Sequence, residues 1–337
     1  MKTKLKTTAI LLAFLFLFMP LSFDVNAESE QKPTVILGGD AFGIKMFCDG
    51  VLVIKTQDVY NSDGRTNPAD DAGLSADDII ITANGKYLTS CEELKKIVEN
   101  SQGDKITLKY LRDEEYRTTS IIPKKDNENK YRLGIWIKDS TAGIGTVTFY
   151  CNNINGFCAL GHGICDSDTG ILMPISSGEA EKANITSVTK SSNGKVGTLN
   201  GYFTNDFIGT ALQNDKSGIY GKTENKTKGK EIEIANNSDV KTGKAYIYTT
   251  IEGNKPKKYE IEIIKLKKSA DVDLVFQITD EEILNKTGGI VQGMSGSPIV
   301  QNGKLVAAVT HVVVENVSCG YGRFADTMYD NLENVCE

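Results

Sequence analysis

The segment Gly293-Met294-Ser295-Gly296-Ser297-Pro298 indicates both the fold and the chemistry of this chain more strongly than any other stretch. Glycines flank Ser295, and the proline begins an apolar stretch that is typical of a strand. Glycine before and after a serine permits a tight turn that exposes the hydroxyl and directs main-chain N–H groups at one point, where an oxyanion would sit. The segment therefore predicts that Ser295 is a nucleophile on a turn that leads into a strand.

A serine hydroxyl is a weak nucleophile and needs a general base. The chain has two histidines, His162 and His311. His162 lies between glycines at the end of an apolar run, and an imidazole is suited to take and return a proton near neutral pH. We therefore predict that His162 is the base, with a purely structural strand-end histidine as the alternative. His311 lies within the apolar run LVAAVTHVVVEN, where we expect a structural or pocket-lining role.

A third group should orient the imidazole and favour the imidazolium as it forms. Composition alone leaves several candidates open, namely Asp139, Asp166, Asp168, Asp206, Asp273 and Asp280. Asp280 also has a structural interpretation, because Thr279-Asp280-Glu281-Glu282 resembles the start of a helix, where carboxylates are favoured.

Residues 133–337 show many short apolar segments separated by Gly, Asn and Asp turns. The predicted strands are 143–150, 157–160, 185–189, 195–199, 202–207, 231–234, 245–250, 258–265, 272–278, 289–291, 298–300 and 305–314. The one clear helical pattern covers 280–285. Many short strands and few helices predict a β-barrel or a β-sandwich.

Residues 34–123 are typical of a separate small module, followed by the charged linker 124–132. A hairpin of strands 42–48 and 51–56 is predicted around Asp49-Gly50. A buried strand at 79–83 follows, then a helix that begins at the capping box of Ser90 and Glu93, and a second hairpin.

This order of elements resembles a PDZ domain. The resemblance rests on Phe42-Gly43-Ile44 as the carboxylate-binding loop, on Ala72-Gly73-Leu74, and on Asp77-Asp78-Ile79-Ile80 before Asn84-Gly85. PDZ domains bind extended peptides by adding a strand to a sheet edge. The alternative is a small α+β packing module without a peptide ligand.

The N-terminus has the layout of an export signal. Lysines precede the apolar run 9–19, and Val25-Asn26-Ala27 is a small-residue cleavage pattern, so residues 1–27 are predicted to be a signal peptide or an uncleaved anchor. Either places the rest of the chain outside the cytoplasm. The net charge of −6 and the lack of a basic stripe argue against nucleic-acid binding.

The chain has seven cysteines, so at least one thiol is unpaired. Cys151, Cys158 and Cys165 are spaced by seven residues, which is not a zinc pattern. We expect buried free thiols with at most one bridge, and no metal site.

The export segment, the PDZ-like module and the motifs AGIGTVTFY, ALGHGI and TGGIVQGMSGSPI together resemble the SpoIVB peptidase family (stage IV sporulation protein B). The resemblance implies a mainly β chain, with a small α+β PDZ-like domain followed by a chymotrypsin-like double β-barrel peptidase domain. Carried over by position, it makes His162 the base, Asp280 the orienting carboxylate and Ser295 the nucleophile.

The same resemblance implies regulated proteolysis in sporulation. Members cleave themselves and a membrane-bound regulatory partner in the space between forespore and mother cell. That cleavage activates an intramembrane protease, which processes a late sigma factor. Acyl transfer of this kind needs no metal or organic cofactor, and the backbone N–H groups of Gly293 and Ser295 would bind the oxyanion. By analogy with chymotrypsin-like proteases, Gly289 would floor an uncharged specificity pocket.

Two other functions remain open from the residues. One is a catalytically inactive or ligand-gated PDZ scaffold in the cell envelope, which intact His162, Asp280 and Ser295 disfavour. The other is an HtrA-like quality-control protease, which the position of the PDZ-like module before the peptidase disfavours.

Overall fold

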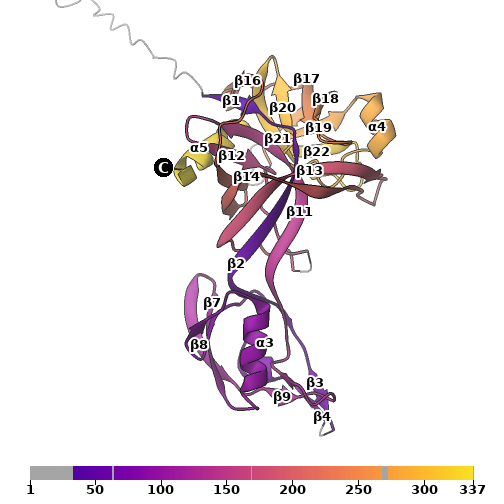
Figure 1. Cartoon of the computed structure of the whole chain (residues 1–337). Coiled ribbons are helices and arrows are strands. Elements are labelled where there is room, and N and C mark those ends of the chain that lie inside the picture. Colours follow the sequence, from indigo (N-terminus) through magenta and orange to yellow (C-terminus); the bar gives the residue numbers. More distant parts are fainter. Residues whose placement is uncertain (1–32, 63, 168, 268–271, 337) are drawn as a thin grey trace, which may run out of the picture. The chain divides into compact units, whose positions relative to one another are not determined.

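The computed structural model describes residues 33–336 apart from 63, 168 and 268–271. The predicted signal segment, 1–27, lies outside the described residues. Strands dominate the described part (Figure 1), which confirms the predicted mainly β fold class. Within the described part, no helix is long and apolar enough to cross a membrane.

The first half of the predicted peptidase domain is a ring of antiparallel strands. β11 (Ile135–Cys151), β12 (Gly156–Ala159), β15 (Gly218–Thr223), β14 (Thr198–Asp215), β13 (Ser177–Thr189) and β2 (Ala41–Thr56) pair in that order. The pairing of β2 with β11 closes the ring. The short strands β1 (Thr34–Leu37) and β16 (Glu231–Glu233) extend it beside β11. The ring encloses a core that includes Phe42, Ile44 and Phe157.

The second half is a closed barrel. Its strands are β17 (Gly243–Thr249), β18 (Lys257–Leu266), β19 (Leu274–Ile278), β22 (Cys319–Phe324), β21 (Lys304–Val312) and β20 (Pro298–Gln301), in order of pairing. In β18, Tyr259, Ile261 and Ile263 are buried while the residues between them are not. This alternation lets one face of the strand enter the barrel core. The chain therefore has the predicted double β-barrel.

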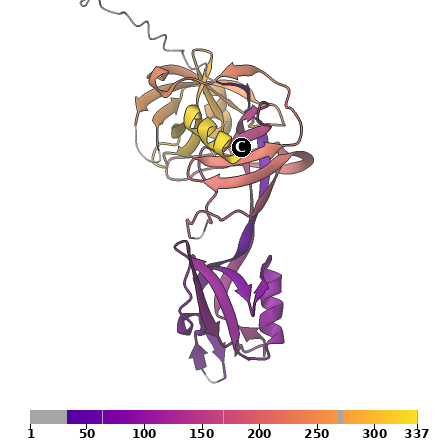
Figure 2. The same ribbon diagram turned by 90° about the vertical axis from the view of Figure 1, so that its left-hand side faces the viewer.

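The PDZ module comprises β3 (Val59–Asn61), β4 (Gly64–Thr66), α2 (Pro68–Asp71), β5 (Ile79–Ala83), β6 (Lys86–Tyr87), α3 (Cys91–Asn100), β7 (Ile106–Arg112) and β8 (Glu115–Ile121). Short strands β9 (Lys124–Lys125) and β10 (Tyr131–Arg132) follow. Figure 2 shows α3 beside the strands of the module. The predicted cap is present, since Ser90 Oγ accepts the Glu93 N–H. Leu94 and Val98 are the buried residues of α3.

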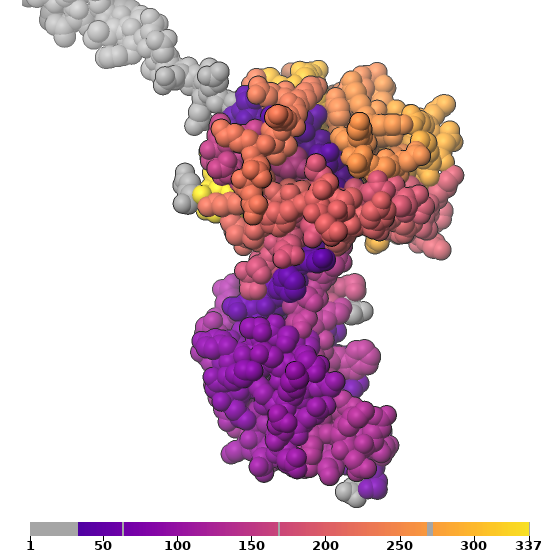
Figure 3. Space-filling model, in the orientation of Figure 1, coloured from indigo at the N-terminus to yellow at the C-terminus, as the bar shows by residue number. Residues whose placement is uncertain are grey.

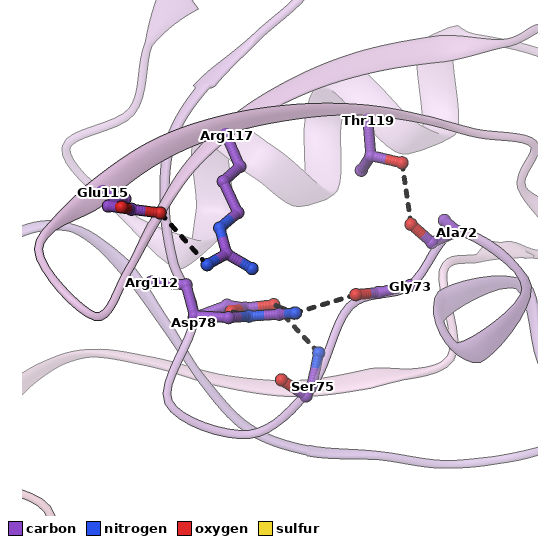
Figure 4. Close-up of polar contacts among 8 residues, drawn as sticks. All are labelled: Ala72, Gly73, Ser75, Asp78, Arg112, Glu115, Arg117 and Thr119. Atoms are coloured by element: carbon purple, nitrogen blue, oxygen red, sulfur yellow. Dashed lines mark hydrogen bonds and ion pairs between the residues drawn. The ribbon is translucent and has the colours of Figure 1, made fainter.

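A buried ion pair fixes the turn before β5. Asp78 is fully buried, and Arg112 donates to both of its carboxylate oxygens, at 2.6 and 2.7 Å (Figure 4). Arg112 also donates to the Gly73 carbonyl, and Ser75 N–H donates to Asp78. A buried charge is tolerated when it is paired and hydrogen-bonded in this way. Asp78 therefore has a structural role in the PDZ module.

The PDZ module is an insertion within the first barrel. β1 and the first half of β2 pair with β11, β13 and β16, so residues 34–47 belong to the first barrel and the short strands beside it. In Figure 3 the indigo atoms of these first strands lie among the magenta and orange atoms of the barrels. The predicted module boundary at 34 is therefore too early. The predicted hairpin at Asp49-Gly50 is also wrong, because β2 continues through it and keeps partners on both sides.

Two helices lie near the C-terminal end of the described chain. α4 (Glu281–Thr287) occupies the predicted helical segment. The sequence patterns do not predict α5 (Ala325–Cys336), whose residues Met328 and Leu332 are buried in a core with β12 and β15. All seven cysteines are free thiols, as expected, but they are not all buried: Cys91 and Cys336 are half-buried and Cys165 is exposed.

Candidate active site

Ser295 lies on the turn that leads into β20. Gly293 and Gly296 have φ angles of +100° and +94°, which L side chains rarely adopt. A Cβ on Gly296 would also lie 1.9 Å from the Thr146 carbonyl oxygen, so this position requires glycine. Among the described residues, no group accepts a hydrogen bond from the N–H of Gly293 or Ser295. Two available donors beside a serine hydroxyl are what an oxyanion hole requires.

Strand β11 supports this turn. Thr146 N–H donates to the Ser295 carbonyl at 2.9 Å, and Thr146 Oγ1 donates to the Gly293 carbonyl at 2.8 Å. Thr148 Oγ1 donates to the Gly296 carbonyl at 2.9 Å. Both threonine side chains are fully buried. Sequence reasoning missed this role; its one local signal is the alternation of threonines within AGIGTVTFY, which places both on one face of the strand.

His162 follows β12 at the point where the chain turns. Leu160 and Gly161 both have positive φ, at 70° and 67°, and they redirect the backbone after the strand. His162 Nδ1 lies 2.8 Å from the Gly163 carbonyl oxygen. A carbonyl can only accept, so Nδ1 carries the hydrogen and Nε2 is left as the acceptor. The ring is therefore held in the tautomer that a general base needs.

His311 lies against His162. The ring centroids are 4.3 Å apart and the planes are tilted by 32°. Burial, and to a smaller extent the neighbouring His311, lower the pKa of His162 to about 4, against the opposing effect of the bond to Gly163. At neutral pH the imidazole of His162 is consequently uncharged and able to accept a proton.

The serine hydroxyl is engaged elsewhere in this structure. Ser295 Oγ donates to the Thr310 carbonyl at 2.6 Å. To give its proton to His162, the hydroxyl must therefore release the Thr310 carbonyl. The structure shows a resting arrangement of the nucleophile.

Both residues open on one cleft of about 800 Å³. Its lining includes Ser295, His162 and His311, which is the pocket-lining position expected for His311. Apolar residues of both barrels, such as Ile144 of β11 and Val312 of β21, also line it. Gly289, which was predicted to floor the specificity pocket, is not among the lining residues. Within the described part of the chain, no group of three metal-ligating side chains occurs.

Ser295, His162 and His311 of this cleft lie within a match to a known protein family. The family model of the SpoIVB peptidase S55 family matches residues 129–329, which are more than half of the chain. This chain belongs to the SpoIVB peptidase S55 family. A PDZ domain matches residues 42–122. The chain thus combines an S55 peptidase family domain with a PDZ domain, as the resemblance implied.

Other similarities cover parts of the S55 peptidase. The serine protease Do-like HtrB of Bacillus subtilis is 30% identical over 104 residues, which are 30% of this chain and 20% of that protein. The chain thus spans about a fifth of that relative's length. The PDZ domain of an SdrC-like protein from Listeria monocytogenes is 24% identical, with a TM-score of 0.22, over 26% of this chain and 87% of its own. The HtrA-type protease AlgW with a decapeptide is 11% identical, with a TM-score of 0.36, over 62% and 55%.

Asp280 is not brought to the imidazole of the S55 peptidase. It caps the N-terminus of α4, where its Oδ1 accepts the N–H groups of Glu282 and Ile283. Its Oδ2 accepts the Glu260 N–H at 3.3 Å. Asp280 is absent from the cleft lining, and His162 Nδ1 faces Gly163 instead. The structure therefore supports the helix-start interpretation of Asp280 rather than its predicted role as the orienting carboxylate.

The predicted carboxylate-binding loop of the PDZ domain is also misplaced. Phe42, Gly43 and Ile44 lie in β2 within the first barrel, between β11 and β13. Phe42 is fully buried and Ile44 nearly so. A strand paired on both edges cannot bind a peptide terminus, so these residues belong to the peptidase core. Sequence reasoning placed them in the loop because the glycine is flanked by apolar residues, a pattern that a buried strand shares.

Proposed function

We propose that this peptidase cleaves a small number of regulatory proteins outside the cytoplasm, as part of sporulation signalling. Its substrates in this proposal are a second copy of itself and a membrane-bound regulatory partner. Cleavage of the partner activates an intramembrane protease and hence the processing of a late sigma factor. Family membership and the export-signal layout of residues 1–27 support the proposal.

The proposed chemistry is acyl transfer. Ser295 Oγ attacks the peptide carbonyl while His162 Nε2 takes its proton and later returns it to the leaving amine. The N–H groups of Gly293 and Ser295 bind the oxyanion, and each such donor lowers the barrier by about 3 kcal/mol. Water then hydrolyses the acyl-enzyme. The site residues in these steps carry the reaction without a metal or cofactor.

The observation that carries the proposal is the convergence of three features on one cleft. Ser295, the neutral tautomer of His162 and two available N–H donors all meet there. A PDZ scaffold without activity would have no need of this arrangement. The insertion of the PDZ module before the cleft residues also differs from a protease that carries its PDZ domain after the catalytic domain.

The first test is chemical. Residues 28–337 and their Ser295→Ala variant are incubated with a fluorophosphonate probe and examined by mass spectrometry. We expect the probe on Ser295 of the wild type, self-cleavage near the N-terminus of the wild type, and neither in the variant. An unlabelled, full-length wild type after days at high concentration would contradict the proposal.

The second test is cellular. In an endospore former that lacks its own S55 peptidase, the full-length chain should restore processing of the late sigma factor, and Ser295→Ala should not. If the wild type is labelled by the probe but does not restore processing, the peptidase acts in a different pathway.

A further inference from the structure

The groove of the PDZ module already contains a strand of the same chain. In β2, Leu52 and Val53 pair on one side with the β5 region, through the pair Leu52–Ile79 and the Val53 N–H bond to Asp78 O. On the other side, Leu52 and Val53 pair with Lys138 and Ile137 of β11. Peptides bind to PDZ domains by adding a strand to a free sheet edge. Here that edge is taken by residues 135–138 of the chain itself.

Residues 135–139, which we name the internal strand, have the features of a bound peptide. The internal strand runs antiparallel to β2 and also contacts α3. Ile135 and Ile137 pack against the core of the module and are only partly buried. Cys91 N–H, at the start of α3, donates to Asp139 Oδ2 at 2.7 Å. Apolar side chains at alternate positions and a carboxylate held by a main-chain N–H are what an extended acidic peptide would present.

The internal strand also pairs irregularly with β2, with one register shift inside it and one at its end. The register between β2 and β11 shifts between Trp136 and Ile137 and again between Lys138 and Ser140. Bulges of this kind interrupt a ladder of hydrogen bonds. The pairing of the internal strand is therefore partly separated from the continuous ladder that follows in the barrel.

We propose that the internal strand is a built-in ligand of the PDZ groove, and that partner peptides bind by displacing it. The partner is an extended segment with aliphatic side chains two residues apart and an acidic group two residues further on, matching Ile135, Ile137 and Asp139. The binding part of this proposal stands by itself. Its second part, an effect of peptide binding on Ser295, rests on the proposed function.

That effect follows from the contacts of β11. Lys138 Nζ lies 2.5 Å from Oδ2 of Asp166, a buried residue in the loop that follows His162. Further along the same strand, Thr146 holds the carbonyls of Gly293 and Ser295. Exchange of the internal strand for a peptide removes Lys138 from the His162 loop and frees the start of the strand that supports the Ser295 turn. Peptide binding is thereby coupled to the nucleophile, which rests on Thr310 when the groove is filled internally.

The chain contains its own reporter for the exchange. Trp136 is the single tryptophan, lies in the internal strand, and is 53% exposed. Its ring lies 4.4 Å from Lys55 Nζ, and its Nε1 donates to Gln57. Displacement of the internal strand removes Trp136 from both neighbours and changes its emission.

The binding experiment uses residues 28–337 with Ser295→Ala, so that no cleavage interferes. The probe is a synthetic peptide that copies residues 133–140 with phenylalanine at the tryptophan position. The control peptide carries aspartate at both isoleucine positions. We expect a saturable change in Trp136 emission with the first peptide and none with the second. No change with the first peptide, or equal changes with both, would overturn the proposal.

A variant strengthens the test. Ile137→Asp weakens the internal ligand, so the competing peptide should bind about tenfold more tightly or better, because the open state becomes more populated. Ile122→Asp, at an exposed isoleucine outside the groove, should leave the affinity unchanged. Both variants are first shown to be folded by circular dichroism. Equal affinities of Ile137→Asp and Ile122→Asp for the copied peptide would then contradict the proposal that the internal strand is a ligand of the groove.

The effect of peptide binding on Ser295 is tested with the wild-type chain. The copied peptide should raise the rate of fluorophosphonate labelling of Ser295, and the control peptide should not. A chain that shows the emission change but no rise in labelling would refute the coupling. A chain that is never labelled contradicts the proposed function instead, because the emission assay does not depend on activity.

Discussion

At His162, a main-chain carbonyl does part of the work that a carboxylate does in a serine–histidine–aspartate triad. The Gly163 oxygen fixes the tautomer and the direction of the ring. It carries no full negative charge, so it stabilises the imidazolium less than an aspartate would. The neighbouring imidazole of His311 opposes that charge further. The residue-scale consequence is a base that stays neutral over a wide range of pH.

Asp280→Asn separates the two roles of that residue. Asparagine caps a helix about as well as aspartate, but its amide nitrogen cannot accept the Glu260 N–H. The helix-start role therefore predicts that the free energy of unfolding falls by no more than about 1.5 kcal/mol and that labelling of Ser295 persists. A role as the orienting carboxylate predicts a loss of about 10⁴ in rate. Labelling rates and urea unfolding of both proteins decide between them, with Asp280→Ala as a control that removes the cap at a cost of about 1 kcal/mol.

The pH dependence follows from the lowered pKa of His162. Protonation inactivates the base, so labelling of Ser295 should persist below the ordinary histidine pKa and fall only towards pH 4. Between pH 6.5 and 4 the unfolded chain binds this proton and the folded chain does not, so His162 also makes the fold less stable as pH falls.

His311→Ala removes one of the two causes that lower this pKa. The acid limb of the labelling rate should therefore move to higher pH, while a substantial part of the rate remains at pH 8. His162→Ala should abolish labelling at every pH. An unmoved limb in a folded His311→Ala protein, or a loss as complete as that of His162→Ala, would contradict these assignments.

Among the elements, β11 holds the Ser295 turn in place, through hydrogen bonds from Thr146 and Thr148 to three carbonyls of the turn. Thr146→Val keeps the shape of the side chain but removes the donor to the buried Gly293 carbonyl. An unsatisfied buried carbonyl costs about 1–3 kcal/mol of stability. The displaced turn should lower the labelling rate by about tenfold to a hundredfold. Thr141→Val, on the same strand, is the matched control in both assays and should change neither.

The elements also show which features can be predicted from the sequence. Gly293 to Pro298 and the Ser90 cap are set by neighbours within a few residues, so local rules find them. The continuity of β2 through Asp49-Gly50 depends on partners near residues 79 and 138, which the local turn signal does not contain. The same long-range pairing explains why the local pattern around Phe42 predicts a binding loop, whereas the residue lies in a barrel core.

On the scale of the whole molecule, the PDZ module interrupts a barrel that is otherwise complete. Phe47 and Ser140 are direct partners across the antiparallel pair of β2 and β11. A two-residue turn can join such partners. Replacing 48–139 by Asn-Gly should therefore give a soluble peptidase with both barrels. Asp166→Asn accompanies the deletion, because the buried carboxylate loses the Lys138 ammonium.

Circular dichroism and fluorophosphonate labelling check this shortened chain. We expect a β-rich spectrum and a labelled Ser295. Its labelling rate should not respond to the peptide that copies residues 133–140, since the groove is gone. Aggregation of the shortened chain under conditions where the full chain is soluble would show that the barrel needs the module in order to fold.

The insertion also sets the order of events during folding. Ala41 and Thr146 are partners in the first barrel, yet they lie far apart in the chain. Closing a loop of about a hundred residues is entropically unfavourable, and the penalty grows with the logarithm of its length. The contacts of α3, β7 and β8 are more local, and local contacts form faster. Once the module has formed, it holds Leu52 opposite Lys138. The remaining residues of β2 and β11 can then pair one after another, towards Ala41 and Thr146. The folded module thus brings the two barrel strands together, and the cleft between the barrels is among the last parts of the chain to form.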